Sequence, residues 1–584
     1  MKRLLIGLSL LAVSAFAFAE PFVWPSAWSN ATTEEAVMGG TFRIALIGDP
    51  RTFNPVTSAE SQALSDFLFN NAPSLIFRGP DSDEWVPYTA ESYTVNEDGT
   101  VVDVVLRDGV LWSDGSPVTA QDYYIRYLLE TDPDVGSNGY DSWFMGDDQI
   151  QVEMTSDMSL RFTFPRPDRL AFPVVAMIPV PDKVFGEAYR SGGAEAVQAL
   201  WGTDVDVTET LWVNAFVPTS FQPGERVILE KNPYFGEWNV DEAGNALPYL
   251  DTYAMTIAGD LDSALNLYLA GEVDQFNPRN LDDIGTINVA VQNGDIDAIV
   301  MESVSPVASS QFIVWNWNMA SNPDKEALFR NVNFRRAMAH LMDKDSIIEL
   351  VYSGAGLPMY SNVYPINDFW VNHDLADMYP YDPERAAQLL AEIGYDRRNA
   401  DGVLTNAAGH TVSFTLATNA GNTAREQIAQ IFGDAAREIG VDVQVQAIDF
   451  NLLVEQLLSE GEDRPFDSIL IGLTGGSRDW PFGVNVIPCG TNLHMYNTTD
   501  SCISPLETLM GQLFSEGRET LDTEAAREIG YEIQAVEAEL MPILYAVSPM
   551  AHYSWTSDLR GYHQEGQINP LLGAYELPLL FMAQ

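Results

Sequence analysis

The sequence is poor in the side chains that most often carry enzyme chemistry or hold metal ions. It contains two cysteines, six histidines and five lysines in 584 residues. No lysine follows a glycine, so a Walker A loop is absent, and so are H-E-x-x-H, C-x-x-C and G-x-S-x-G. We therefore expect a protein that is not an enzyme and holds neither a cofactor nor a metal ion. The enzyme alternative is a secreted carbohydrate-active enzyme that uses two carboxylates as acid and nucleophile.

Positive charge is scarce as well. Lysine and arginine together number 30 against 83 aspartates and glutamates, which gives a formal net charge of −53. This charge excludes nucleic acid and anionic membrane surfaces as partners, because both repel it. Salt screens self-repulsion of this size, so the acidity suits a saline or alkaline exterior, and plain solubility is the alternative explanation.

Only one hydrophobic run is long, and it lies at the start of the chain. Lys2 and Arg3 precede the apolar residues 4–18, and Ala17-Phe18-Ala19 is a cleavage signal, so residues 1–19 are predicted to be a signal peptide. The run is shorter than the ~20 residues that span a bilayer. Because no cysteine stands at the cleavage point, we expect an exported, periplasmic protein without a lipid or membrane anchor.

The two cysteines, Cys489 and Cys502, stand close together in the sequence. In an oxidising compartment they can form a disulfide, and closing so short a loop stabilises the fold by roughly 3 kcal/mol in the chain-entropy model. Two unpaired buried thiols are the alternative. A metal site at these cysteines is not expected, because the sequence lacks the spacing of Cys and His residues that a four-ligand site requires.

Length and local patterns predict several α/β units. A chain of 584 residues is too long for one core. Asn333 is predicted to cap a helix, Asp382 and Pro383 begin another that Gly394 ends, and a third closes at Gly440. Alternating valines at 441–445 then predict a strand. A helix followed directly by a strand is typical of an α/β fold.

The stretch from Leu106 to Asp122 is the most distinctive. The valines at 101–105 follow a turn at 96–99 and predict a hairpin, while Thr119 and Asp122 form a capping box that opens a helix. The whole run closely resembles the signature of family 5 extracellular solute-binding proteins, the oligopeptide and dipeptide receptors of ABC importers. Residues 224–234, 334–343, 381–386 and 438–441 resemble further blocks of that family in the same order, whereas residues 212–216 depart from its usual G-T-G-P-Y.

The resemblance implies two α/β lobes that close over a ligand by a hinge, with an additional middle domain. The expected division is a signal peptide at 1–19, an N-terminal extension at 20–38, lobe I at 39–60, 206–305 and 541–584, a middle domain at 61–205, and lobe II at 306–540. It also implies an ABC permease as partner and a monomeric receptor.

The resemblance also points to a ligand site in residues 472–483. Asp479 matches the family position that pairs with the α-ammonium group of a peptide; pairing with Arg478 or capping a turn is the structural alternative. Gly476 lets backbone approach a ligand, and Trp480 can stack on a side chain or a sugar. Ala59, Glu60 and Ser61 resemble the segment that binds an extended peptide like an added strand. Arg478 in the same loop is a further ligand-binding candidate. The remaining candidates are Trp315, Trp317, Trp370 and Tyr140, for which packing in the core is the alternative.

Two ligand classes stay open at this stage. An oligopeptide is favoured by Asp479, and an oligosaccharide by the tryptophans and by the lack of the D-P that usually follows in peptide receptors. A nickel ligand is disfavoured because the histidines do not cluster.

Overall fold

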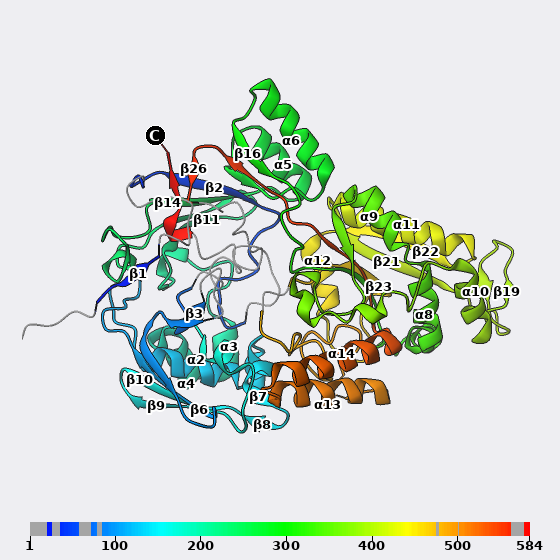
Figure 1. Ribbon diagram of the computed structural model, residues 1–584, viewed down its shortest axis with the longest axis horizontal. Helices are drawn as coiled ribbons and strands as arrows, with labels where there is room; N and C mark the ends of the chain where they lie inside the picture. Colours follow the sequence, from blue (N-terminus) through cyan, green and yellow to red (C-terminus); the bar gives the residue numbers. More distant parts are fainter. Residues whose placement is uncertain are drawn as a thin grey trace, which may run out of the picture.

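The computed structural model describes residues 20–25, 36–57, 72–78, 84–474, 478–499, 501–561 and 577–583. The predicted signal peptide lies outside them. These residues form two bodies side by side (Figure 1), each with its own hydrophobic core. One core extends from Trp24 to Met255 and includes residues 551–581, and the other extends from Ala308 to Val547. We call the two bodies the first lobe and the second lobe.

The first lobe contains two four-stranded sheets. One has the order β11-β12-β14-β2, in which β2 pairs in parallel with β14 and the other pairs are antiparallel. Its strands are β2 (Thr41–Leu46), β11 (Phe216–Gln222), β12 (Arg226–Lys231) and β14 (Thr252–Ile257). Gly224, with φ 72°, forms the turn of the hairpin between β11 and β12.

The other sheet of the first lobe holds the predicted hairpin and helix. Its order is β5-β6-β10-β9, all antiparallel. The strands are β5 (Ala90–Val95), β6 (Val101–Leu106), β9 (Gln151–Ser156) and β10 (Ser159–Thr163), and α2 (Ala120–Glu130) begins at the predicted capping box of Thr119 and Asp122. The helices α3 (Ala171–Val175) and α4 (Glu187–Gln198) follow.

Short strands complete this lobe. They are β1 (Phe22–Trp24), β3 (Ile76–Arg78), β4 (Trp85–Pro87), β7 (Phe144–Met145), β8 (Asp148–Gln149), β13 (Asn239–Asp241), β26 (Leu559–Arg560) and β27 (Phe581–Met582). The strand β1 lies within the predicted N-terminal extension. It pairs in parallel with β13, and the Trp24 Nε1–H donates to Asn239 Oδ1 at 2.8 Å, so this part of the extension packs into the first lobe.

The second lobe is built on a mixed six-stranded sheet of order β18-β24-β17-β23-β21-β22. The strands are β17 (Gln311–Trp315), β18 (Gly356–Pro358), β21 (Ser413–Asn419), β22 (Asp442–Ile448), β23 (Ser468–Ile471) and β24 (Ile543–Pro549). A small hairpin of β19 (Arg397–Arg398) and β20 (Leu404–Thr405) lies apart from this sheet.

The described residues of the second lobe also form eight α-helices. They are α7 (Pro323–Arg330), α8 (Val332–Leu341), α9 (Lys344–Tyr352), α10 (Pro383–Glu392), α11 (Thr423–Glu438), α12 (Phe450–Leu457), α13 (Pro505–Glu519) and α14 (Thr523–Leu540). The cap expected at Asn333 is wrong by two residues, because the Asn331 side chain accepts from Asn333 N–H and α8 begins at Val332. Asp382 caps α10 as predicted.

A third, small core lies beside the first lobe (Figure 1, α5 and α6). It consists of α5 (Leu261–Leu269), α6 (Leu281–Asn293) and a sheet of β15 (Gln275–Phe276), β25 (Tyr553–Thr556) and β16 (Ala298–Met301).

The chain passes between the lobes along two adjacent segments. Val304 N–H donates to Ala551 O at 3.0 Å, Ala551 N–H to Ser305 O at 2.7 Å, and Val307 N–H to Pro549 O at 3.0 Å. By packing, β24 belongs to the second lobe, so the last crossing lies after Pro549 and not at the predicted boundary between 540 and 541. Two short crossing segments, with separate cores on either side, are the arrangement that a hinge requires.

Candidate ligand-binding cleft

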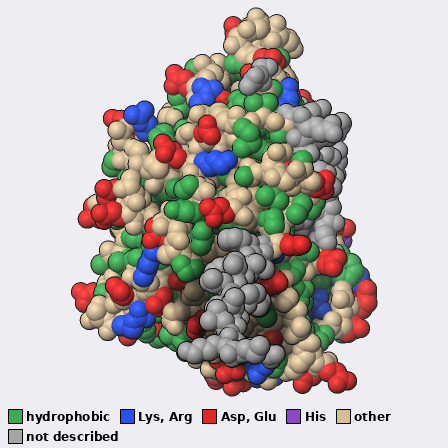
Figure 2. Space-filling view, turned by 90° about the vertical axis from the view of Figure 1, so that its left-hand side faces the viewer, with side chains coloured by type: hydrophobic (Ala, Val, Ile, Leu, Met, Phe, Trp, Pro, Cys, Tyr) green, Lys and Arg blue, Asp and Glu red, His purple; other side chains and the backbone are tan. Residues whose placement is uncertain are grey.

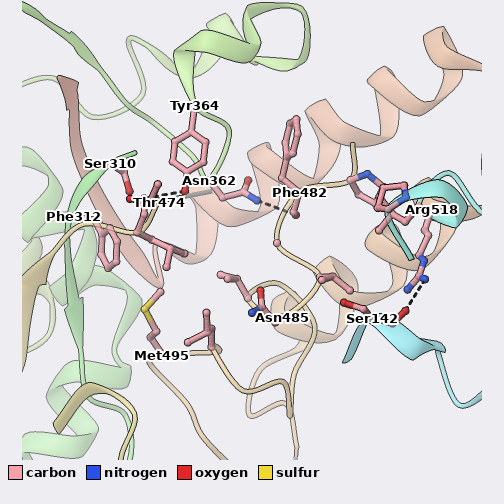
Figure 3. A pocket seen from close by; sticks show the side chains of 18 of the residues that line it. Ser142, Ser310, Phe312, Asn362, Tyr364, Thr474, Phe482, Asn485, Met495 and Arg518 are labelled. Atoms are coloured by element: carbon pink, nitrogen blue, oxygen red, sulfur yellow. Dashed lines mark hydrogen bonds between the residues drawn. The ribbon is translucent and has the colours of Figure 1, made fainter. Parts of the chain in front are cut away.

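A cavity of about 330 Å³ lies between the two lobes (Figure 3). The first lobe contributes Ser142, Leu170 just before α3, and Pro173 and Val174 within α3. The second lobe contributes the beginning of β17, the loop after β18 and the segment after β23. The lining residues are Ser142, Leu170, Pro173, Val174, Ser310, Phe312, Asn362, Tyr364, residues 473–474 and 481–486, Leu493, Met495, Arg518 and Tyr545. We call this space the interlobe cavity.

The wall of the interlobe cavity is apolar and nearly free of charge. Among the described residues that line it, Arg518 is the one ionisable side chain apart from the tyrosines. Its guanidinium is neutralised by Asp168 of the first lobe, with Nε and Nη2 at 2.9 and 2.7 Å from the two carboxylate oxygens. Arg518 also donates to the carbonyls of Phe144 and Ser142. In a chain with 83 carboxylates, this wall is a marked exception.

Other arginines join the lobes around the cavity. Arg166 pairs with Glu519 of α13 at 2.7 Å. Arg169 donates to the carbonyls of Trp480, Thr520 and Leu521 across the interface. These interlobe contacts use several of the chain's few cations, and sequence reasoning did not identify them.

Asp479, the predicted ammonium anchor, is paired with an arginine from the opposite lobe. Arg78, at the end of β3, donates from Nη1 and Nη2 to the two carboxylate oxygens of Asp479 at 3.1 and 2.6 Å. The guanidinium also lies over the Trp85 ring at 4.5 Å. Arg78 is a partner that the sequence did not indicate. Arg478 itself is half-buried in the same loop.

Trp480 and Trp370 stack on each other inside the second lobe. Their rings lie 5.0 Å apart with an interplanar angle of 8°. Gly517 makes room for Trp480, since a Cβ there would lie 2.2 Å from the Trp480 ring. Arg169 from the first lobe lies near both rings, 5.5 and 6.0 Å from their centroids. Packing accounts for both tryptophans, and ligand contact by either of them stays a prediction.

The other predicted site residues lie in different surroundings. Trp315 and Trp317 are fully buried in the core of the second lobe and do not line the interlobe cavity. Tyr140 lines a second hollow of about 480 Å³ between the 3-10 helix η3 (Tyr140–Trp143) and α13. In that hollow, burial raises the pKa of Asp141 to about 6. Gly476 and the segment of Ala59, Glu60 and Ser61 lie outside the described residues.

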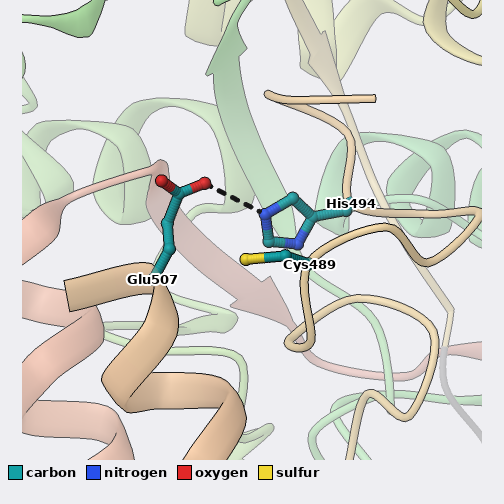
Figure 4. Close-up of side chains that lie close together, drawn as sticks. All are labelled: Cys489, His494 and Glu507. Carbon is teal, nitrogen blue, oxygen red and sulfur yellow. Dashed lines mark hydrogen bonds and ion pairs between the residues drawn. The ribbon is translucent and has the colours of Figure 1, made fainter. Parts of the chain in front are cut away.

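Cys489 and Cys502 form a disulfide. Cys489 also lies near His494 and Glu507, with potential ligand atoms within 4.8 Å of one another (Figure 4). Their polar atoms are already engaged, because His494 Nδ1 lies 2.8 Å from Val486 O and Nε2 lies 3.3 Å from Glu507. Glu507 also accepts from Ser504 N–H at 2.7 Å. These bonds, with the disulfide, account for the cluster as a structural one.

The surface reflects the acidic composition. On the face in Figure 2, acidic side chains are spread over the visible elements and do not gather in one patch. Among the described helices, none combines the length and the apolar character that crossing a membrane requires.

Comparison with known proteins adds to this geometry. Residues 84–492 match the family model described as "Bacterial extracellular solute-binding proteins, family 5 Middle". A "Probable ABC transporter-binding protein" of Deinococcus radiodurans is 36% identical over 581 residues, covering 98% of this chain and 97% of the relative.

Two solved structures share the fold at lower identity. The oligopeptide-binding protein AppA of Bacillus subtilis, in complex with a nonapeptide, has a TM-score of 0.78 at 22% identity, covering 94% of this chain and all of that one. The periplasmic binding protein MelB of Agrobacterium fabrum C58, in complex with stachyose, has a TM-score of 0.81 at 19% identity, covering 97% and 88%. These likenesses confirm the predicted two-lobed α/β fold class.

Proposed function

The chain belongs to the bacterial extracellular solute-binding proteins of family 5, which serve ABC importers, and we propose that it binds an oligopeptide between its lobes and delivers it to a permease. The proposed location is the periplasm, after removal of residues 1–19. At the family level the chain is a solute-binding protein and not an enzyme.

The apolar wall of the interlobe cavity is the observation that carries the oligopeptide proposal. A sugar ring carries hydroxyl groups around its edge, and each buried hydroxyl needs a hydrogen-bond partner. Leu170, Val174, Phe312, Phe482 and Met495 offer none through their side chains. The faces of Trp370 and Trp480, which would suit a sugar, are used by each other and by Arg169. An apolar peptide side chain fits such a wall better.

Asp479 is the proposed anchor for the α-ammonium group. Arg78 orients the carboxylate by two hydrogen bonds. Ligand that contacts both lobes favours the closed state, because only the difference in affinity between open and closed forms drives closure. The pair of Arg78 and Asp479 would then tighten as the ligand closes the lobes.

An oligosaccharide is the second candidate, favoured by the fold shared with the stachyose complex of MelB. The carbohydrate-active enzyme is less well supported, because no Asp or Glu side chain is among the described residues that line the interlobe cavity.

Isothermal titration with a pentapeptide and with stachyose tests the proposal. We expect binding of the peptide and heat close to that of dilution with the sugar. Binding of stachyose without binding of the peptide would show that the ligand is a sugar, while the assignment as a solute-binding receptor would stand. Asp479→Asn should weaken peptide binding, whereas Asp103→Asn, which breaks the exposed bidentate pair with Arg161, is the matched control.

A further inference from the structure

A histidine side chain joins the two segments that cross between the lobes. His552 stands directly before β25, and Ser303 follows β16 by two residues, so both lie where the crossing segments meet the small third core. Ser303 N–H donates to Nδ1 of His552 at 2.9 Å. The neighbouring backbone bonds join Val304 to Ala551 and Ala551 to Ser305. The imidazole is therefore an additional cross-link within the hinge.

The bond with Ser303 fixes the protonation state of the ring. A backbone N–H can only donate, so Nδ1 is an unprotonated acceptor, and the neutral ring carries its proton on Nε2. His552 is 2% exposed, and its Nε2 has no hydrogen-bond partner among the described residues. A proton added to Nδ1 would place two donors against each other. Protonation of His552 therefore breaks its bond to Ser303.

Ser303 is held in an uncommon backbone conformation. Among the described residues other than glycine, four have a positive φ, and Ser303 is one of them, with φ 49°. The left-handed region costs free energy for an L-residue, and the bond to His552 helps to hold Ser303 there. Hinge motions are absorbed by a few residues near the ends of elements. Ser303 is such a position, because rotation of its backbone relieves the strain and moves its N–H away from the ring.

Burial is the largest influence on the pKa of His552 and lowers it from the ordinary 6.5, against the carboxylates of Glu302 and Asp283, which favour the charged ring. Glu302 lies in the segment after β16. Asp283 stands in the first turn of α6, where Arg279 pairs with Asp262 and Asp283 at 2.6 and 2.8 Å. The ring is therefore neutral at pH 7 and takes up a proton at a more acidic pH than an unperturbed histidine.

We propose that His552 is a pH-sensitive lock of the hinge, which holds Ser303 in the closed arrangement when neutral and releases it when protonated. The lobes of the structure are joined by ion pairs such as that of Asp168 with Arg518, so the bond belongs to the closed arrangement. Release in acid then favours open lobes, and a ligand held between the lobes loses affinity, because only the difference between the two forms drives closure. The lock acts on the two-lobed receptor whatever its ligand is.

Hydrogen exchange measured by mass spectrometry tests the bond itself. Protection factors compare each amide with an unstructured peptide at the same pH, which removes the ordinary pH dependence of exchange. Between about pH 7.5 and about pH 5, the range in which histidine titrates, protection around Ser303 should fall about tenfold. In His552→Asn it should stay constant, because the asparagine oxygen accepts from Ser303 without titrating. His373→Asn, at an exposed histidine paired with Asp368, is the matched control and should behave as the unmodified protein does.

Calorimetry with a pentapeptide tests whether the lock acts on closure. Over the same pH range, affinity should fall about tenfold more in the unmodified protein than in His552→Asn, which corresponds to about 1.4 kcal/mol. Asp141 and Glu537, with pKa values of about 6 and about 7, also titrate there, and comparison of the two proteins cancels their contribution. His552→Leu, which removes the acceptor, should bind near neutral pH as weakly as the unmodified protein binds in acid.

The outcomes separate the lock from the oligopeptide function. Equal protection factors for the unmodified protein and His552→Asn at every pH would overturn the lock. A fall in protection with unchanged pentapeptide affinity would show that release of Ser303 has no effect on closure, which also refutes the proposal. If the pentapeptide binds at no pH, the oligopeptide function fails, while the exchange profiles still support or refute the lock.

Discussion

Replacing Asp168 by asparagine should destabilise the closed state and thereby weaken ligand binding. Asp168 and Arg518 come from opposite lobes, and their side chains are 0% and 4% exposed. The substitution keeps the shape of the side chain and removes its charge. The Arg518 guanidinium would then remain in the closed cleft with the carbonyls of Ser142 and Phe144 as its partners.

The magnitude follows from burial. Removing one partner of a buried ion pair costs about 3–5 kcal/mol when the other charge stays buried. Here the lobes can separate and hydrate Arg518, so the cost falls on closure and not on the folding of either lobe. Taking about 3 kcal/mol, we expect the ligand Kd to rise by roughly 100-fold, since each 1.4 kcal/mol is tenfold. The melting temperature of the ligand-free protein should change little.

Calorimetry gives the Kd, and small-angle X-ray scattering gives the radius of gyration with and without ligand. Asp103→Asn is the control, because Asp103 forms a similar bidentate pair with Arg161 while 42% exposed, and such pairs contribute about 0–1 kcal/mol. Replacing both Asp168 and Arg518 by apolar residues should recover part of the loss. If Asp168→Asn binds and closes as Asp103→Asn does, the pair has no part in the ligand-bound state.

Three further predictions concern charge and covalent links. Burial raises the pKa of Glu537 to about 7 from 4.5, so the protonated side chain stabilises the fold fully below about pH 4.5, and this stabilisation is lost as the pH rises to about 7. In urea unfolding, Glu537→Gln should not show this loss of roughly 3 kcal/mol. Equal pH profiles for the two proteins would show that Glu537 does not cause the loss. Reducing the disulfide of Cys489 and Cys502 should lower the free energy of unfolding by roughly 3 kcal/mol, measured in urea with and without reductant; an unchanged midpoint would show that the bridge does not stabilise the fold. The ratio of the affinity for a peptide with a free N-terminus to that for the N-acetylated peptide should fall towards one in Asp479→Asn. The same ratio should rise in Arg78→Met, which removes the competing cation. Calorimetry measures both ratios, and no change in either variant would exclude Asp479 as the anchor.

Local patterns predicted much of the fold. The capping box of Thr119 and Asp122 begins α2, and Asp382 with Pro383 begins α10, because capping depends on side chains within a few residues. The valines at 101–105 form β6 and bury alternate side chains. The family resemblance supplied the two lobes, which no local pattern could have given.

The ion pairs between the two lobes could not be predicted from the sequence. Arg78 and Asp479 are 401 positions apart, and Arg518 and Asp168 are 350 apart. Pairing over such distances depends on how the lobes pack, and with so many carboxylates each arginine had many possible partners. Trp480 could be singled out from the sequence, but its burial depends on Gly517 of a helix that follows later in the chain. Scarcity of cations was the one signal that could have drawn attention to the arginines.

Mass spectrometry of the small molecules released when the purified protein is denatured identifies the ligand class without prior choice of a candidate. We expect a mixture of short peptides, in lower yield from Asp168→Asn than from the unmodified protein. Release of hexose oligomers without peptides would contradict the oligopeptide assignment.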